Sequence, residues 1–269
     1  MTGGDLTRIT VFGLGEAGSL ISADLAASGI EVWAYDPAEV ITPDGVKRFD
    51  KPEDAVLDAD AVLGITAQAD ATEAISQAIH RINKSSLYAD LSTSSAAVKR
   101  QLADIAAGHG IDFVDIALMT LVPGNGLRTP ALAAGQGAER FVSIFKPLGM
   151  PVEAISDIPG DAATRKLLRS VMMKGLASLV IEAMRAGYAA GCEEWLWNNM
   201  AEQLTAADEK MMARLITGTG LHALRRLHEM EASLSLLQDL GVDPVMTRAT
   251  VESHRQVLDQ GVPDIPDHG

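Results

Sequence analysis

Residues 8–37 constrain the fold of this chain more than any other stretch. A short run of β-branched and aromatic residues at 9–12 leads directly into the sequence GLGEAG at 13–18. Residues 19–28 continue with apolar side chains at helical spacing, and residues 30–35 have the composition of a second buried strand. The order of strand, glycine turn, helix and strand predicts a βαβ unit that closes within about 30 residues.

The glycines of this unit stand where a dinucleotide-binding turn requires them. Gly13 permits the tight turn, Gly15 lets the backbone approach a pyrophosphate, and Gly18 lets the helix lie close to the strand. N–H groups at the start of the helix bind the anion. The alternative is a glycine turn of the same fold that binds no nucleotide. We expect the cofactor to contact the whole turn, namely Gly13, Leu14, Gly15, Glu16, Ala17 and Gly18.

Asp36 follows the second predicted strand, about 20 residues after the glycines. A carboxylate at this point accepts hydrogen bonds from the adenosine ribose hydroxyls and repels a 2′-phosphate. No arginine follows within residues 37–40. The sequence therefore favours NAD over NADP as the cofactor.

The composition excludes several classes of protein. At 269 residues the chain is long enough for two domains, and its net charge of −14 argues against nucleic acid and anionic membrane surfaces as partners. The single cysteine, Cys192, excludes an internal disulfide and a cysteine-rich metal site, which indicates a cytoplasmic setting. Residues 1–8 lack a signal-peptide pattern, and no apolar run reaches membrane length.

Strand and helix patterns alternate up to about residue 158. The fold class predicted is α/β, a doubly wound parallel sheet of Rossmann type covered on both faces, in a dinucleotide-binding domain of residues 1–158. Strand patterns disappear from residue 161 onward, so residues 159–269 are expected to form an all-helical domain led by one long interdomain helix at 162–190. Further helices are expected at 193–199, 205–217, 221–240 and 243–260.

Polar residues follow two of the predicted strands, at the sheet edge where such folds bind ligands. Thr66 and Ala67 come after the strand at 61–65, and we expect them near the cofactor. Ser92 and Thr93 come after the strand at 87–91 and are candidates for binding the substrate or the nicotinamide carboxamide. The alternative for this serine-rich segment is a simple helix N-cap.

Two segments carry a family resemblance. The sequence DLSTSS at 90–95 resembles the D-x-S-T-x-S-P substrate motif of the β-hydroxyacid dehydrogenases, the superfamily of 3-hydroxyisobutyrate and 6-phosphogluconate dehydrogenases. The sequence GDAATRKLLRS at 160–170 looks like the glycine, small residues and catalytic lysine that open that family's interdomain helix. The likeness extends over the whole chain in element order and domain size.

The resemblance implies that Lys166 is a general acid and base at the substrate oxygen. A carbonyl that accepts hydride needs a proton donor, and a partly desolvated lysine ammonium supplies one at a pKa lowered toward neutrality. The alternative is a solvated helix lysine. The resemblance also implies a homodimer.

Several positions depart from the family pattern. Where the family has D-A-P-V-S-G-G, the chain reads DIALMTLVPG at 115–124, so that Thr120 replaces the serine in part and Met119 and Leu121 indicate an apolar wall. Ser170 stands where the family has an asparagine, and His228 and Glu229 stand where it has a lysine and an aspartate. These departures indicate a divergent branch with a variant C-terminal domain.

Four further residues are substrate candidates. Arg128 can bind a carboxylate, and Lys174 follows Lys166 two turns along the same helix face. His222 and His228 lie about two turns apart, on roughly one face of the helix expected at 221–240. The alternative for each is an exposed or core side chain without a role. No His, Cys or carboxylate constellation suggests a metal.

The predicted function is an NAD(P)-dependent oxidoreductase that acts on a small hydroxy acid or a related hydroxy or oxo compound. The first alternative is an imine reductase, which shares the architecture and usually has another residue at the position of Lys166. The second alternative is a dinucleotide-binding sensor without catalysis.

Overall fold

The computed structural model describes residues 8–266, in two compact units. The first unit ends at Arg169 and the second begins at Ser170. Both residues lie within one continuous helix, so the domain boundary expected at residue 158 stays a prediction. The expected absence of a signal peptide falls almost entirely on residues outside the described range. Within that range no helix is long and apolar enough to span a membrane.

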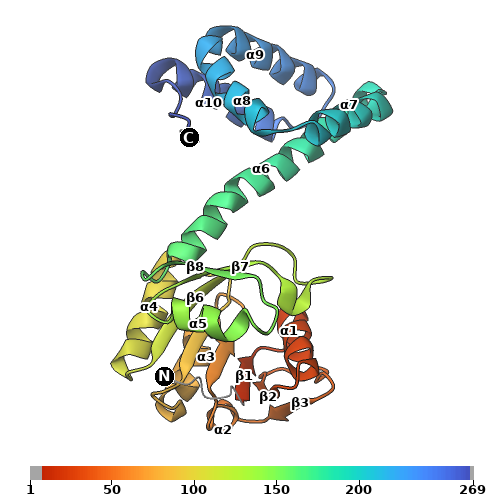
Figure 1. The fold of residues 1–269 in the computed structure, drawn as a ribbon. Helices are drawn as coiled ribbons and strands as arrows, with labels where there is room; N and C mark the ends of the chain where they lie inside the picture. The colour runs from red at the N-terminus through yellow and green to blue at the C-terminus, as the bar shows by residue number, and fades with distance from the viewer. Residues whose placement is uncertain (1–7, 267–269) are drawn as a thin grey trace. The chain divides into compact units, whose positions relative to one another are not determined.

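The first unit is built on an eight-stranded sheet (Figure 1). Its order is β3-β2-β1-β4-β5-β6-β7-β8, with the strand order reversing between β1 and β4. The predicted Rossmann-type sheet is confirmed. The strands are β1 (Arg8–Phe12), β2 (Glu31–Tyr35), β3 (Val46–Phe49), β4 (Ala61–Gly64), β5 (Leu87–Asp90), β6 (Asp112–Leu118), β7 (Ala131–Ala134) and β8 (Val152–Ser156).

The sheet is parallel, as predicted, except at one pair of strands. Strand β7 runs antiparallel to β6, with Asp115 opposite Ala134, and β8 is parallel to β7. A parallel pair needs a crossover connection, usually an α-helix, whereas an antiparallel pair does not. Residues 119–130 contain only the short 3-10 helix η2 (Gly126–Arg128), which explains the reversal.

Helices cover both faces of the sheet, and each face has its own apolar cluster. Alternate residues of a strand enter opposite clusters, as Val11 and Phe12 of β1 do. One face carries α1 (Glu16–Ala27) and α5 (Ala138–Phe145). The other carries α2 (Pro52–Ala55), α3 (Ala71–Ala78) with η1 (Ile79–Arg81), and α4 (Ala96–Gly108).

The second unit consists of helices, as predicted for the C-terminal domain. Helix α6 (Asp161–Ala190) begins in the first unit, and α7 (Glu193–Thr205), α8 (Glu209–Leu221), α9 (Ala223–Asp239) and α10 (Val245–Gln260) follow. Helix α7 begins at residue 193 as predicted but ends at residue 205 instead of 199, and α8 spans residues 209–221 instead of the predicted 205–217. Asp208 caps α8 by accepting the N–H of Met211 at 2.7 Å, which moves the break to residues 206–208.

Glu182 of α6 caps helix α10 and is only 5% exposed. Its carboxylate accepts the N–H of Met246 at 2.6 Å, and the N–H and hydroxyl of Thr247 at 2.8 and 2.7 Å. Burial on its own raises the pKa of Glu182. The hydrogen bonds from Thr247 and Met246, together with the charge of Arg248, outweigh burial and lower the pKa below its ordinary value.

The lowered pKa predicts a pH-dependent contribution to stability. The ionised carboxylate stabilises the fold at neutral pH, and this contribution is lost as the pH falls through the folded-state pKa. We expect Glu182→Gln to lower the free energy of unfolding by about 1–2 kcal/mol near pH 7. In urea unfolding of both proteins, at pH 7 and at a pH below the ordinary carboxyl pKa, this difference should shrink at the lower pH. A difference of the same size at both pH values would contradict the assignment.

Candidate active site

The glycine turn lies where the strand order reverses, next to the end of β4. Gly13 has a φ of +93°, and an added Cβ would lie 2.3 Å from the carbonyl oxygen of Ile65. A Cβ on Gly18 would lie 1.8 Å from the carbonyl oxygen of Gly13. Both glycines are therefore required by the packing of the turn itself.

Gly15 differs from its two neighbours, because a Cβ there would meet nothing within 4 Å. Its φ of −66° is also open to any residue. Gly15 lines two adjacent pockets. Protein packing does not explain this glycine, whereas the close approach of a pyrophosphate does.

We therefore expect Gly15→Ala to separate stability from binding. The free energy of unfolding should change by no more than about 0.5 kcal/mol. Affinity for the dinucleotide should fall about tenfold or more, because the methyl group enters the space that the pyrophosphate needs. Gly18→Ala is the matched control and should lower stability as well. Titration of NADH fluorescence and urea unfolding measure the two effects, and unchanged affinity in Gly15→Ala would refute this role.

The first pocket has a volume of about 440 Å³ and extends from the glycine turn to α3. Among the described residues that line it, Asp36, Asp70 and Glu73 are acidic and none is basic. Asp36 accepts the N–H of Leu14 at 2.6 Å and of Ala38 at 2.8 Å. A carboxylate has about four acceptor sites, so it can also accept hydrogen bonds from ribose hydroxyls.

Arg48 of β3 orders the loop after β2, and sequence reasoning missed it. Its guanidinium donates to the carbonyl oxygens of Asp36, Ala38 and Val40 at 2.9, 2.6 and 3.1 Å. Arg48 lies beyond residues 37–40, the segment in which an arginine would indicate binding of a 2′-phosphate, and no local motif marks it. Only the pairing of β2 with β3 brings it to this loop.

The second pocket, of about 360 Å³, lies beside the first. Most predicted cofactor and substrate residues of the first unit line it. Thr66 lines both pockets, and its hydroxyl oxygen is buried without a hydrogen-bond partner among the described residues. An unpartnered polar atom and an open glycine are what a bound dinucleotide would use. The lining residues named in the sequence-based prediction are Gly15, Glu16, Ala17, Gly18, Thr66, Ala67, Ser92, Thr93, Thr120 and Lys166.

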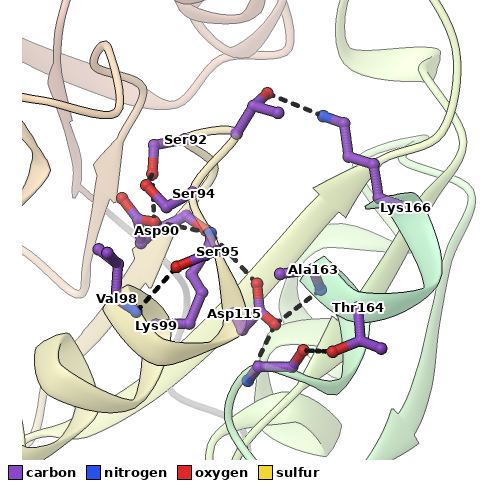
Figure 2. A network of polar contacts seen from close by, with 12 residues as sticks. Asp90, Ser92, Ser94, Ser95, Val98, Lys99, Asp115, Ala163, Thr164 and Lys166 are labelled. Carbon is purple, nitrogen blue, oxygen red and sulfur yellow. Dashed lines mark hydrogen bonds and ion pairs between the residues drawn. The ribbon is translucent and has the colours of Figure 1, made fainter. Parts of the chain in front are cut away.

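Lys166 and Thr93 meet at this pocket. The Lys166 ammonium donates to the Thr93 hydroxyl oxygen at 3.2 Å (Figure 2). Thr93 is exposed, whereas Ser92 points inward and donates to Asp90 at 2.6 Å. The helix-cap alternative does not account for Ser92 and Thr93, because the side chain of Ser95 caps α4.

Behind Thr93 lies a buried ion cluster of Lys99, Asp90 and Asp115, called the Lys99 cluster below (Figure 2). The Lys99 ammonium lies 2.6 Å from the Asp90 carboxylate and 3.1 Å from the Asp115 carboxylate. It also donates to the Asp90 carbonyl at 2.7 Å. Asp115 accepts the N–H groups of Gly160 and Ala163 at 3.1 and 3.0 Å, at the start of α6.

The remaining substrate candidates lie elsewhere. Met119 packs against the small apolar cluster of Ala117, Ala134 and Ala162 and does not line the pocket. Leu121, the other residue expected in the apolar wall, does line the pocket, together with Leu118, Val122 and Pro123. Arg128 is exposed on η2 and is likewise absent from the pocket lining.

Ser170, Lys174, His222 and His228 belong to the second unit, and their substrate roles stay predictions. The prediction that His222 and His228 lie on one helix face is wrong, however. His222 lies in the break between α8 and α9, with φ −125° and ψ 26°, so it does not share a helix face with His228. The reason is that the continuous helix expected at 221–240 begins only at Ala223.

Two family models match separate parts of the chain. The family model for the NAD-binding domain of 6-phosphogluconate dehydrogenase matches residues 8–119, and a domain of unknown function, DUF1932, matches residues 188–257. The chain therefore carries a 6-phosphogluconate dehydrogenase-like NAD-binding domain, followed by a DUF1932 domain. The first of these is a nicotinamide-dinucleotide-binding domain of the kind found in dehydrogenases and reductases.

Relatives of this 6-phosphogluconate dehydrogenase-like chain differ in what is known of them. A probable 3-hydroxyisobutyrate dehydrogenase of Mycobacterium tuberculosis is 27% identical over 55% of this chain and 51% of its own length. A solved conserved hypothetical protein of Sinorhizobium meliloti is 28% identical, with coverage of 96% and 92% and a TM-score of 0.62. An imine reductase variant of Myxococcus stipitatus, solved with NAD⁺, is 18% identical, with coverage of 95% and 94% and a TM-score of 0.81, and shares the fold.

Proposed function

We propose that the chain is an NAD-dependent oxidoreductase that interconverts a small hydroxy acid, or a related hydroxy compound, and its oxo form. The observation that carries this proposal is the contact of Lys166 with Thr93 in the pocket that the glycine turn also lines. A sensor without catalysis has no need of a lysine held at this place.

The proton chemistry follows from the residues of the pocket. The bound nicotinamide supplies the hydride in one direction and accepts it in the other. Lys166 in its ammonium form donates a proton to the carbonyl oxygen as the hydroxyl forms, and the neutral amine takes that proton back in the reverse reaction. Because the Thr93 oxygen accepts from Lys166, the Thr93 proton is available to hydrogen-bond the substrate oxygen or the carboxamide.

The pocket lining limits the substrate. Lys166 is the single cation among the described residues that line it. Four apolar residues at 118 and 121–123 form one wall, and Thr120 supplies a hydroxyl beside them. We infer a small substrate that places its reacting oxygen at Lys166 and an apolar part against this wall.

The acidic lining of the first pocket supports NAD rather than NADP, because a 2′-phosphate would meet Asp36 with no cation among the described lining residues. We expect NAD to bind about tenfold more tightly than NADP or better. Cofactor titrations by fluorescence measure this ratio, and an equal or reversed ratio would overturn the preference. The imine reductase of Myxococcus stipitatus is known in complex with NADP⁺ and its V8 variant in complex with NAD⁺, so the fold accepts either.

Imine reduction is the second candidate. The apolar wall favours it, since an imine substrate needs no carboxylate-binding group. The lysine favours the hydroxy compound, because an imine nitrogen that arrives protonated needs no further proton donor. The deciding measurement is a panel of small 2- and 3-hydroxy acids, sugar acids and cyclic imines, assayed with both cofactors by the absorbance of the reduced form. Turnover of imines alone would replace the first proposal, and cofactor binding without any turnover would favour a sensor.

Two further proposals concern the state of the protein. We propose a homodimer, because the second unit exposes large apolar side chains, including Tyr188, Trp195 and Trp197 at 67%, 64% and 58%. We also propose a cytoplasmic location, from the single exposed Cys192. Sedimentation velocity and cell fractionation test the two.

A further inference from the structure

The Lys99 cluster lies outside the pocket lining, yet it contacts both elements that meet at the pocket. Lys99 lies on α4, Asp90 ends β5 and Asp115 lies on β6. The side chains of Asp90 and Asp115 are 0% exposed and that of Lys99 is 1% exposed. Substrate and cofactor cannot touch this cluster, so any effect on the reaction acts through other residues.

One arm of the Lys99 cluster leads to Lys166. Asp115 accepts the N–H groups of Gly160 and Ala163, which frame the start of α6. Lys166 follows Ala163 within one helical turn. The position of the first turn of α6 therefore depends on the position of the Asp115 carboxylate, and Lys99 forms an ion pair with that carboxylate.

The other arm leads to Thr93. The Asp90 carboxylate binds Lys99 and accepts the hydroxyl of Ser92, which also contacts the hydroxyl of Ser94 at 2.7 Å. Thr93 lies between these two serines, so both of its neighbours are fixed from the buried side. Both partners of the Lys166–Thr93 contact are thus connected to one ammonium group.

The charges of the cluster explain why Lys99 is needed. Two carboxylates face one ammonium, which leaves one surplus negative charge in a site without water access. The N–H groups at the positive end of α6 stabilise that surplus. Without Lys99 the two carboxylates would repel one another, and Asp115 would move relative to α6.

We propose that Lys99 and Asp115 are positioning residues that set the place of Lys166 relative to Thr93. The catalytic part of this inference rests on the proposed role of Lys166, whereas the geometric part does not. Sequence patterns did not indicate this positioning role, because Lys99 has the pattern of a polar residue on the exposed face of a helix.

Three variants test the proposal. Lys99→Met removes the ammonium. Asp115→Asn leaves one acceptor oxygen, which cannot serve Lys99 and the start of α6 together. The double variant Lys99→Met/Asp115→Asn has the same net charge in the cluster as the wild type, and its amide can accept from α6 and donate to Asp90. Ser86→Ala is the control, because it removes a buried hydrogen bond to the Ala59 carbonyl at the opposite end of β5.

Two readouts need no substrate. Labelling by trinitrobenzenesulfonate, followed by peptide mass spectrometry, reports the accessibility of Lys166, with Lys174 as the reference lysine in each sample. Amide hydrogen exchange of residues 158–168 reports the order of the first turns of α6. We expect each single variant to speed labelling of Lys166 about threefold or more and to lower kcat about tenfold or more, at unchanged cofactor affinity.

The double variant decides whether Lys99 acts through Asp115. We expect its labelling rate, exchange and kcat to lie closer to the wild type than those of either single variant, since coupled residues show non-additive effects. It also keeps the test open if Lys99→Met fails to fold. The proposal is overturned if the two losses multiply, or if all variants match Ser86→Ala. If labelling responds as expected while Lys166→Ala retains turnover, the positioning role stands and the proposed acid and base role fails.

Discussion

Lys166→Ala is expected to lower kcat about a hundredfold or more while the affinity for the cofactor changes little. The proton at the substrate oxygen would then have to come from water, and the Thr93 hydroxyl would lose the hydrogen bond that it accepts from the Lys166 ammonium at 3.2 Å. Cofactor affinity should persist because the glycine turn and Asp36 are untouched. Steady-state kinetics on the best substrate of the panel and titration of NADH fluorescence measure the two quantities.

Lys166→Arg is the matched control for charge. A guanidinium keeps the positive charge at this place but does not give up a proton near neutral pH. We expect Lys166→Arg to be nearly as impaired as Lys166→Ala if proton transfer is the role. Activity restored by arginine would show that only the charge matters, and activity retained by Lys166→Ala would exclude this lysine and direct attention to His222 and His228.

Lys99→Met is expected to lower the free energy of unfolding by about 3–5 kcal/mol. The variant leaves Asp90 and Asp115 buried without their cation, and a buried charge that loses its partner is among the costliest changes in a folded protein. Urea unfolding followed by far-ultraviolet circular dichroism measures the effect.

Lys84→Met is the control for this prediction, because it makes the same substitution on an exposed lysine. Its effect should stay within about 0.5 kcal/mol. A loss below about 1 kcal/mol in Lys99→Met would mean that the two carboxylates are neutralised in another way, such as by a shared proton.

The cofactor half of the site could be predicted from the sequence because its determinants are local. The glycine turn and Asp36 stand in one short motif whose residue types follow from a single chemical requirement, whereas Lys166 is indicated by the family resemblance. The strand and helix order of the first unit could be predicted for the same reason, since each buried strand shows its own apolar run.

The rest of the site depends on contacts between distant segments. Apolar periodicity places Val98, Leu102 and Ile105 on one face of α4, and all three pack against the core, but the fully buried positions of the helix also include Lys99. The carboxylates of Asp90 and Asp115 allow Lys99 to be buried, but they lie on two strands, and the sequence of α4 does not predict this contact. Sequence reasoning missed Arg48 and Glu182 for the same reason. The partners of Arg48 are backbone carbonyls of a loop that carries no motif for it, and the partners of Glu182 lie at the start of a helix far away in the sequence.

The open space around Gly15 has a consequence for how this family tolerates mutation. A survey of variants scored by protein abundance would find Gly13 and Gly18 intolerant and Gly15 permissive, because only the first two meet the protein's own backbone. The same survey scored by growth on the substrate would find all three intolerant. The difference between the two scores at one glycine would therefore report the presence of the ligand in the cell, without any ligand being isolated.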